Sequence, residues 1–291
     1  MKIAIHGKTF KEEHFIYVKQ LLNALLKYQI QVIVFEPFLA LLQKKNMATS
    51  YFVPYYNHED LNGIDFVFSV GGDGTLLDAV TFIKDKEIPI LGFNAGRLGF
   101  LATTPPKDFE KAVQEFFEGK YTLVSRSLIH LEADKDIFQG INFGLNEFTI
   151  LKKDTSSMIV VHAYIDGTYL NSYWSDGLII STPTGSTGYS LSCGGPLVMP
   201  TSNNFIISPI SPHNLNVRPM VVPDTSELSF KIESRSKNVL VALDSRSKSI
   251  PHTMNLKVRK ENFGVRLVQL NTYSFLETLR SKLNWGLDMR N

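Results

Sequence analysis

The first third of the chain alternates between two spacings of apolar residues. Apolar and β-branched runs at positions 2–6, 31–36, 64–70 and 88–93 predict buried strands. Apolar residues three and four positions apart predict helices at 12–28, 75–86 and 107–118, and positions 37–63 are expected to be irregular. Strands that alternate with helices form βαβ units, so this part is expected to be an α/β domain with a parallel sheet.

The pattern changes near position 121, where strands become frequent and helices disappear. Strands are predicted at 157–164, 168–174, 177–181, 228–233, 239–243, 255–259 and 264–270. Asp166-Gly167 between the first two indicates a type I′ hairpin. These strands predict an all-β, sandwich-like second domain.

Two helices have an apolar face that needs a partner. The face of the helix predicted at 12–28 holds Phe15, Val18, Leu22, Leu25 and Leu26. The final helix, expected at 272–283, presents Phe275, Leu276, Leu279 and Leu283. We expect this last helix to return to the first domain. The predicted domains are therefore 1–119 with 272–291, and 120–271.

The composition indicates an ordinary soluble protein but does not indicate a particular function. The 291 residues are 44% hydrophobic and 20% charged, with a net charge of +2, which suits a soluble protein without a strong electrostatic attraction to nucleic acid or membrane. The one cysteine excludes an internal disulfide and fits the cytoplasm. The N-terminus lacks the apolar core of a signal peptide. The seven histidines show no metal-ligand spacing, so no resident metal is expected.

A glycine-rich segment after the third strand is the clearest chemical signal. Gly71, Gly72 and Gly74 surround Asp73, and Thr75 opens the next predicted helix. Glycines let the backbone approach a ligand closely, and amides at a helix N-terminus favour phosphate. Asp73 adds negative charge at this point, which makes sense if it handles a proton or a metal beside the phosphate. Taken alone, the segment is better explained as a strand-to-helix turn with a capping aspartate.

Three further segments have the polar groups of a nucleotide site. Asn94 and Arg97 follow the fourth parallel strand, at the sheet edge where open α/β folds bind ligands. Asn146 and Glu147 lie side by side between apolar strands and can hydrogen-bond to an adenine edge or a ribose diol. The run from Thr182 to Ser192 offers small hydroxyl side chains that suit phosphate or ribose. The last two segments alone are more often ordinary turns, and Arg97 could bind phosphate or only cap its loop.

In this order the segments resemble the NAD kinase family. The resemblance rests on residues 71–75, 96–100, 146–147, 176–177, 182–190, 208–213 and 218–219, and it covers nearly the whole chain beyond about residue 60. Members of that family transfer a phosphoryl group to the adenosine ribose 2′-hydroxyl of NAD and so make NADP. The resemblance implies the same reaction here, with ATP as donor and a divalent cation, Mg²⁺ or Mn²⁺, that arrives with ATP.

The resemblance also implies roles for individual residues. Asp73 is the implied proton acceptor. The implied NAD-binding residues are Asp73, Gly74, Phe100, Asn146, Glu147, Asp176, Thr187, Gly188, Tyr189, Ser190, Leu191, Ser192 and Arg246. The implied ATP-phosphate residues are Gly71, Gly72, Gly74, Thr75, Asn94 and Arg97. Asp176 is implied to reach the NAD site of a neighbouring subunit in a homo-oligomer, a dimer or tetramer.

Two positions depart from the family pattern. Arg246 stands where the family often has glutamine, and Trp174 stands where a basic side chain is common. Two other functions remain open at this stage: a lipid or sphingoid kinase with the same glycine loop, and a non-catalytic dinucleotide sensor. A lipid acceptor should bring an apolar groove, whereas the Thr182–Ser192 loop is polar. A pure phosphate sensor gains nothing from a carboxylate at Asp73.

Overall fold

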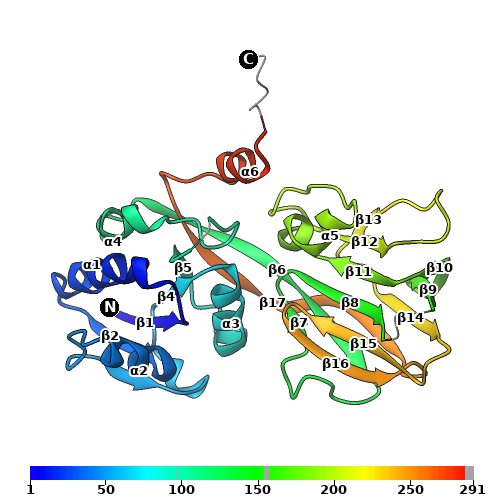
Figure 1. The fold of residues 1–291 in the computed structure, drawn as a ribbon, viewed down its shortest axis with the longest axis horizontal. Helices are drawn as coiled ribbons and strands as arrows, with labels where there is room; N and C mark the ends of the chain where they lie inside the picture. The colour runs from blue at the N-terminus through cyan, green and yellow to red at the C-terminus, as the bar shows by residue number, and fades with distance from the viewer. Residues whose placement is uncertain (97, 154–156, 286–291) are drawn as a thin grey trace. The chain divides into compact units, whose positions relative to one another are not determined.

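The computed structural model describes residues 1–96, 98–153 and 157–285. They form two compact units, residues 1–125 with 265–291 and residues 126–264 (Figure 1). The chain passes between the units within two long strands, β6 (Tyr121–Ala133) and β17 (Leu256–Leu270). Within the described ranges, no helix combines the length and the apolar character needed to cross a membrane.

The first unit is built on a parallel sheet in the order β17-β5-β4-β1-β2-β3. Its strands are β1 (Lys2–Gly7), β2 (Gln31–Phe35), β3 (Val53–Tyr55), β4 (Phe66–Gly71) and β5 (Ile90–Asn94), together with the end of β17. Its helices are α1 (Phe15–Leu26), α2 (Glu36–Lys44), α3 (Asp73–Ile83), α4 (Phe109–Phe117) and α6 (Phe275–Leu283). The predicted α/β domain with a parallel sheet is confirmed.

Alternate residues of the strands face opposite sides of this sheet, as the period of two requires. Ile3 and Ile5 of β1 face a core shared with α1, α2 and α4. Helix α3 lies against β4, β1 and β5 and buries Leu76 and Val80 on the other side. Both faces of the sheet are therefore covered, which explains why its strands read as continuous apolar runs.

The expected irregular stretch at 37–63 is wrong in part. It contains most of α2 and the short strand β3. The signals for α2 are an acid and a proline in the first turn, followed by the buried side chains Phe38, Leu39 and Leu42. Leu26 and Leu276 were predicted to face inward, but these residues are 47% and 49% exposed. Leu26 is the last residue of α1 and Leu276 is the second residue of α6, so both lie near a helix end.

The second unit is a sandwich of two antiparallel sheets. One has the order β13-β12-β11-β8-β15-β16, and the other contains β10-β9-β14-β17. The strands are β7 (Phe143–Gly144), β8 (Glu147–Lys152), β9 (Ile159–Ile165), β10 (Thr168–Ser175), β11 (Gly177–Ser181), β12 (Asn204–Ile210), β13 (Met220–Pro223), β14 (Leu228–Glu233), β15 (Asn238–Leu243) and β16 (Arg246–Pro251). Phe148 of one sheet and Phe230 of the other share the core. The predicted sandwich-like domain is confirmed.

The turn at Asp166-Gly167 agrees with the prediction for this unit, whereas the segment at 184–192 does not. Asp166 and Gly167 both have positive φ, 50° and 78°, as the predicted type I′ turn between β9 and β10 requires. The expectation that helices disappear is wrong at one place. Residues Thr184–Thr187 form a 3₁₀ turn and Tyr189–Ser192 form the short helix α5.

The final helix α6 belongs to the first unit, as predicted. The Tyr273 hydroxyl just before it donates to Asp108 Oδ2 at 2.8 Å, and Leu279 is buried. Phe275 lies 6.2 Å from the ring of Phe100, and the Lys282 ammonium lies 4.7 Å above that ring. The helix thereby contacts a residue implied to bind NAD.

Candidate active site

Asp73 lies at the N-terminus of α3, directly after β4 ends. Its Oδ2 accepts a hydrogen bond from the Phe100 amide at 2.8 Å. Its Oδ1 accepts from the amides of Leu101 and Ala102, at 3.1 and 2.9 Å. The carboxylate therefore holds the loop after β5 against the start of α3.

These three bonds leave Asp73 with spare capacity. An ionised carboxylate has about four lone-pair positions. Among the residues that the structure describes, Oδ1 accepts two hydrogen bonds and Oδ2 accepts one. One position on Oδ2 is left, and it can accept a hydroxyl proton from a ligand.

Gly99 is required by this arrangement. A Cβ atom at position 99 would lie 1.8 Å from Asp73 Oδ1, far inside van der Waals contact. A side chain there would displace the carboxylate or the loop. The sequence motif that contains Gly99 is thus explained by the position of Asp73, 27 residues before the nearest amide that it binds.

The glycines before and after Asp73 differ in what surrounds them. A Cβ at Gly71 would lie 2.1 Å from Thr75 Oγ1, so Gly71 lets the buried Thr75 side chain pack under the turn. A Cβ at Gly72 or Gly74 would meet nothing within 4 Å. The absence of side chains at these two positions leaves open space beside the first turn of α3, where amides and the helix dipole favour an anion.

Asn94 and Phe100 complete the described part of this loop. Asn94 is fully buried at the end of β5, and its amide nitrogen donates to the Ala102 carbonyl at 3.1 Å. In the structure it supports the same loop that Asp73 holds. Phe100 is partly buried beside α6. Arg97, implied to contact phosphate, lies outside the described residues.

The second unit repeats the same device at Asp244. This partly buried carboxylate, in the turn between β15 and β16, accepts from the amides of Leu145, Asn146 and Glu147 at 2.8, 2.7 and 3.2 Å. A Cβ at Gly144 would lie 3.0 Å from Asp244 Oδ1. In both units a glycine and the three amides after it enclose an aspartate. Asp244 therefore fixes the backbone of the implied NAD-binding pair Asn146-Glu147.

Glu147 has a strongly raised pKa. Its Oε2 is shielded from solvent and has no hydrogen-bond partner in the described chain. Burial, followed by the charge of Asp244, raises the pKa of Glu147 to about 8. Burial also raises the pKa of Asp244, but three amides and Arg246 oppose that rise. Glu147 therefore holds a proton at neutral pH.

The loop from Thr182 to Ser192 packs against this pair. Thr182 Oγ1 donates to the Leu145 carbonyl at 2.6 Å, and the Thr182 amide donates to the Asn146 carbonyl at 2.8 Å. A Cβ at Gly188 would lie 3.4 Å from Glu147 Oε2. The structure thus brings Gly188 close to the pair Asn146-Glu147, although about 40 residues separate Gly188 from the pair along the chain.

Other residues of this loop differ in exposure. Ser190 is buried and shares a hydrogen bond with the Ser208 hydroxyl at 3.0 Å, so its side chain serves the fold. Tyr189 is 39% exposed and Ser192 is exposed, whereas Thr187, Gly188 and Leu191 are partly buried. Within the loop, Tyr189 and Ser192 are the side chains most available to a ligand.

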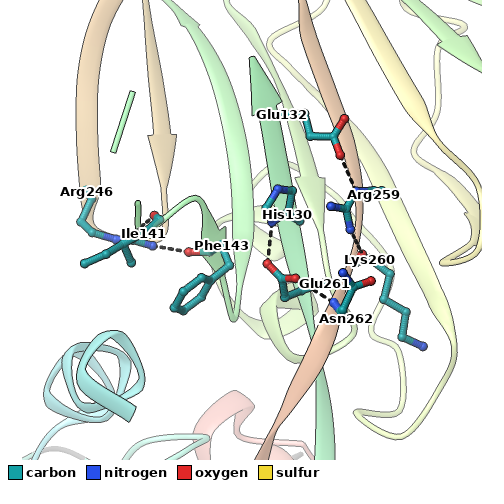
Figure 2. A network of polar contacts seen from close by, with 9 residues as sticks. All are labelled: His130, Glu132, Ile141, Phe143, Arg246, Arg259, Lys260, Glu261 and Asn262. Carbon is teal, nitrogen blue, oxygen red and sulfur yellow. Dashed lines mark hydrogen bonds and ion pairs between the residues drawn. The ribbon is translucent and has the colours of Figure 1, made fainter. Parts of the chain in front are cut away.

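Asp176 and Arg246 are each engaged with other groups. The Lys152 ammonium lies 2.6 Å from Asp176 Oδ1, and 31% of the Asp176 side chain is exposed. The Arg246 guanidinium donates to the carbonyls of Ile141, at 2.6 Å, and Phe143 (Figure 2). Arg246 therefore binds the backbone that leads into Gly144. This contact gives a structural reason for the departure from the family pattern at position 246.

Sequence reasoning singled out the segments that contain Gly99, Gly144 and Asp244, but it missed the support that these residues give to the site. In each case the sequence offers only a glycine followed by three residues and an aspartate far away along the chain. Only the fold shows which aspartate binds which segment. Within the described ranges, no three His, Cys, Asp or Glu side chains gather in a way that could hold a metal ion.

Comparison with known proteins gives the family. Residues 3–121 match the ATP-NAD kinase N-terminal domain, and residues 145–270 match the ATP-NAD kinase C-terminal domain. An NAD kinase of Cytophaga hutchinsonii is 54% identical over the full length of both chains, and one of Flavobacterium psychrophilum is 46% identical over the same extent. The chain belongs to the ATP-NAD kinase family.

Solved structures agree with this assignment. The crystal structure of an Archaeoglobus fulgidus NAD kinase in complex with ATP is 27% identical, has a TM-score of 0.77, and covers 98% of this chain and 99% of its own. A yeast NADH kinase complexed with NADH has a TM-score of 0.86 at 23% identity and covers 100% of this chain and 89% of its own, which shows a common fold. The predicted family and fold class are confirmed.

Proposed function

We propose that this chain transfers the γ-phosphoryl group of ATP to the 2′-hydroxyl of the adenosine ribose of NAD, giving NADP. The observation that carries the proposal is the Asp73 carboxylate, which three amides hold at the start of α3 with one acceptor position remaining. Relatives named NAD kinase at up to 54% identity support it. Neither a lipid kinase nor a non-catalytic sensor is favoured by these relatives.

Asp73 acts as the general base in this proposal. The ribose hydroxyl donates a hydrogen bond to Oδ2, and its proton passes to the carboxylate as the phosphoryl group arrives. Phosphoryl transfer has a loose, highly charged transition state, so catalysis depends mainly on positioning and on neutralisation of charge. The amides of the first turn of α3 and the open space at Gly72 and Gly74 receive donor phosphates.

The two domains predicted from the sequence have separate roles in this proposal. Residues 1–119 with 272–291 form the nucleotide-binding domain, with Thr75 and Asn94 as supports for its loops. Residues 120–271 form the NAD-binding domain, in which Asn146, Glu147 and the Thr187–Ser192 loop hold the adenosine part. Because Glu147 is protonated, it can donate a hydrogen bond to a ligand as well as accept one. The donor is ATP in complex with Mg²⁺ or Mn²⁺.

The reaction can be tested directly. Purified protein is incubated with ATP, Mg²⁺ and NAD, and NADP is measured with an NADP-specific dehydrogenase. Measurable NAD binding without any NADP would favour a sensor and reject the kinase.

The role of Asp73 is tested by Asp73→Asn, which keeps the shape of the side chain but removes the base. We expect turnover to fall by about 10²-fold or more, with the KM for NAD within roughly tenfold of wild type. Asp85→Asn, at a largely exposed acid just after α3, is the matched control and should leave turnover unchanged. Normal turnover in Asp73→Asn would remove Asp73 from the reaction.

We also propose a homo-oligomer, a dimer or tetramer, in which Asp176 reaches the NAD site of a neighbouring subunit. Its partial exposure and its ion pair with Lys152 support this role, because they hold the carboxylate at the surface of the second unit. Sedimentation at the assay concentration would give the oligomeric state. Full activity of a verified monomer would contradict the proposal.

A further inference from the structure

One face of β6 carries three ionisable side chains: Arg126, His130 and Glu132. Even spacing places them on the same side of the strand. Two of them are paired with β17, as Figure 2 shows. His130 Nδ1 lies 2.5 Å from Glu261 Oε2, and Arg259 Nε donates to Glu132 Oε1 at 2.5 Å.

Arg126 has no such partner. Its Nε and Nη1 atoms are shielded from solvent, and no acceptor in the described chain hydrogen-bonds to them. On β17, the residues that continue the row of Arg259 and Glu261 are Phe263 and Val265, which are apolar. Burial lowers the pKa of Arg126 to about 10, so the guanidinium stays charged at neutral pH.

A guanidinium with two shielded nitrogens that lack an acceptor is unfavourable for the folded protein. Its donors lose their hydrogen bonds to water on folding and gain none in return. An apolar side chain of similar length would fill the same space without this penalty. The planar fork of donors matches the oxygens of a phosphate group and can bind them in pairs.

We propose that Arg126 binds a phosphate group of one of the two nucleotide substrates. The inference rests on the proposed function, because ATP and NAD both carry phosphate and no carboxylate. No acid among the described residues pairs with Arg126, and the substrates bring negative charge that its guanidinium can bind. Arg126 belonged neither to the expected ATP set nor to the expected NAD set.

The first test measures stability without ligand. Arg126→Met removes the charge and keeps the length of the side chain. We expect its melting temperature to equal or exceed that of wild type, because an unsatisfied charge is removed. Arg259→Met is the matched control: it breaks the pair with Glu132, and its melting temperature should equal that of wild type or fall slightly.

The second test measures binding. Sodium tripolyphosphate and sodium pyrophosphate are the probes, and the rise in melting temperature that each causes reports binding to the folded protein. We expect Arg126→Met to lose most of the rise with at least one probe, and Arg259→Met to retain it. In steady-state assays the KM for ATP or the KM for NAD should rise about ten- to a hundredfold in Arg126→Met. The substrate affected identifies which phosphate group is bound, and Arg126→Lys should recover part of the loss.

A structural role for Arg126 predicts the opposite results. A melting temperature several degrees lower in Arg126→Met, with unchanged probe binding and both KM values within twofold of wild type, would overturn the proposal. The thermal shifts do not require turnover. A wild-type protein that makes no NADP would reject the proposed function, while the probes would still decide whether Arg126 binds phosphate.

Discussion

Glu147 should make the stability of the second unit depend on pH in a way that one substitution removes. Its carboxyl group is shielded from solvent near Asp244, and the pKa is raised from the ordinary value of 4.5 to about 8. Glu147→Gln keeps the size and shape of the side chain but cannot ionise. A comparison of the two proteins across pH therefore isolates the effect of this one carboxyl group.

The direction follows from proton binding in the two states. Between pH 4.5 and pH 8 the folded protein holds a proton on Glu147 that the unfolded chain has lost, so stability falls as pH rises through this window. The loss is complete above about pH 8, the raised pKa of Glu147. At about 1.4 kcal/mol per pH unit, the rise from 4.5 to about 8 corresponds to at most roughly 5 kcal/mol. Glu147→Gln should lack this loss.

The assay is urea unfolding at pH 5, 7 and 9. A Trp285→Phe background leaves Trp174, in the second unit, as the one tryptophan of the chain. The free energy of unfolding of Glu147→Gln minus that of its parent should increase steadily with pH. Glu227→Gln, at a half-exposed glutamate of the same unit that pairs with Lys257, is the control and should leave the curve parallel to that of the parent. A difference for Glu147→Gln that changes by less than about 1 kcal/mol from pH 5 to pH 9, within the extrapolation error, would refute the reasoning.

The glycine and aspartate pairs give two further predictions. Gly99→Ala should reduce turnover at least as strongly as Asp73→Asn, because its Cβ would lie 1.8 Å from the Asp73 carboxylate. A Cβ at Gly72 would meet no atom within 4 Å, so Gly72→Ala should keep the wild-type melting temperature and raise the KM for ATP. Unchanged kinetics in Gly99→Ala would show that the loop yields without consequence. Asp244→Asn should weaken NAD binding and lower stability by about 1–3 kcal/mol, because an amide cannot satisfy all three backbone donors; calorimetric titration with NAD and urea unfolding measure the two effects, and wild-type values in both would contradict it.

The regular elements were predictable because their signals are local. Continuous apolar runs identified β1 and β4, helical spacing identified α3, and the Asp166-Gly167 turn indicated the β9–β10 hairpin. Helix α2 was missed because it is only nine residues long and follows β2 without a loop. Short elements such as this carry little periodicity, so tertiary contacts decide them.

The candidate site was predictable as a set of motifs but not as a set of contacts. Asp73 and the pair Asn146-Glu147 were identified from the residues and from the family resemblance. Their supports were not, because Asp244 binds amides that lie up to 99 residues before it along the chain. Arg246 illustrates the same limit: its position was noted, but its binding to the Ile141 carbonyl depends on the fold.

The two enclosed aspartates have a consequence for how this chain can change. Asp73 fills the space that a side chain at Gly99 would need, and Asp244 does the same at Gly144. The overlap would be more severe at Gly99, where a Cβ would lie 1.8 Å from the carboxylate, than at Gly144, where it would lie 3.0 Å away. Neither member of a pair can grow while the other stays. A design that moves either loop into another scaffold must therefore move its glycine and its aspartate together.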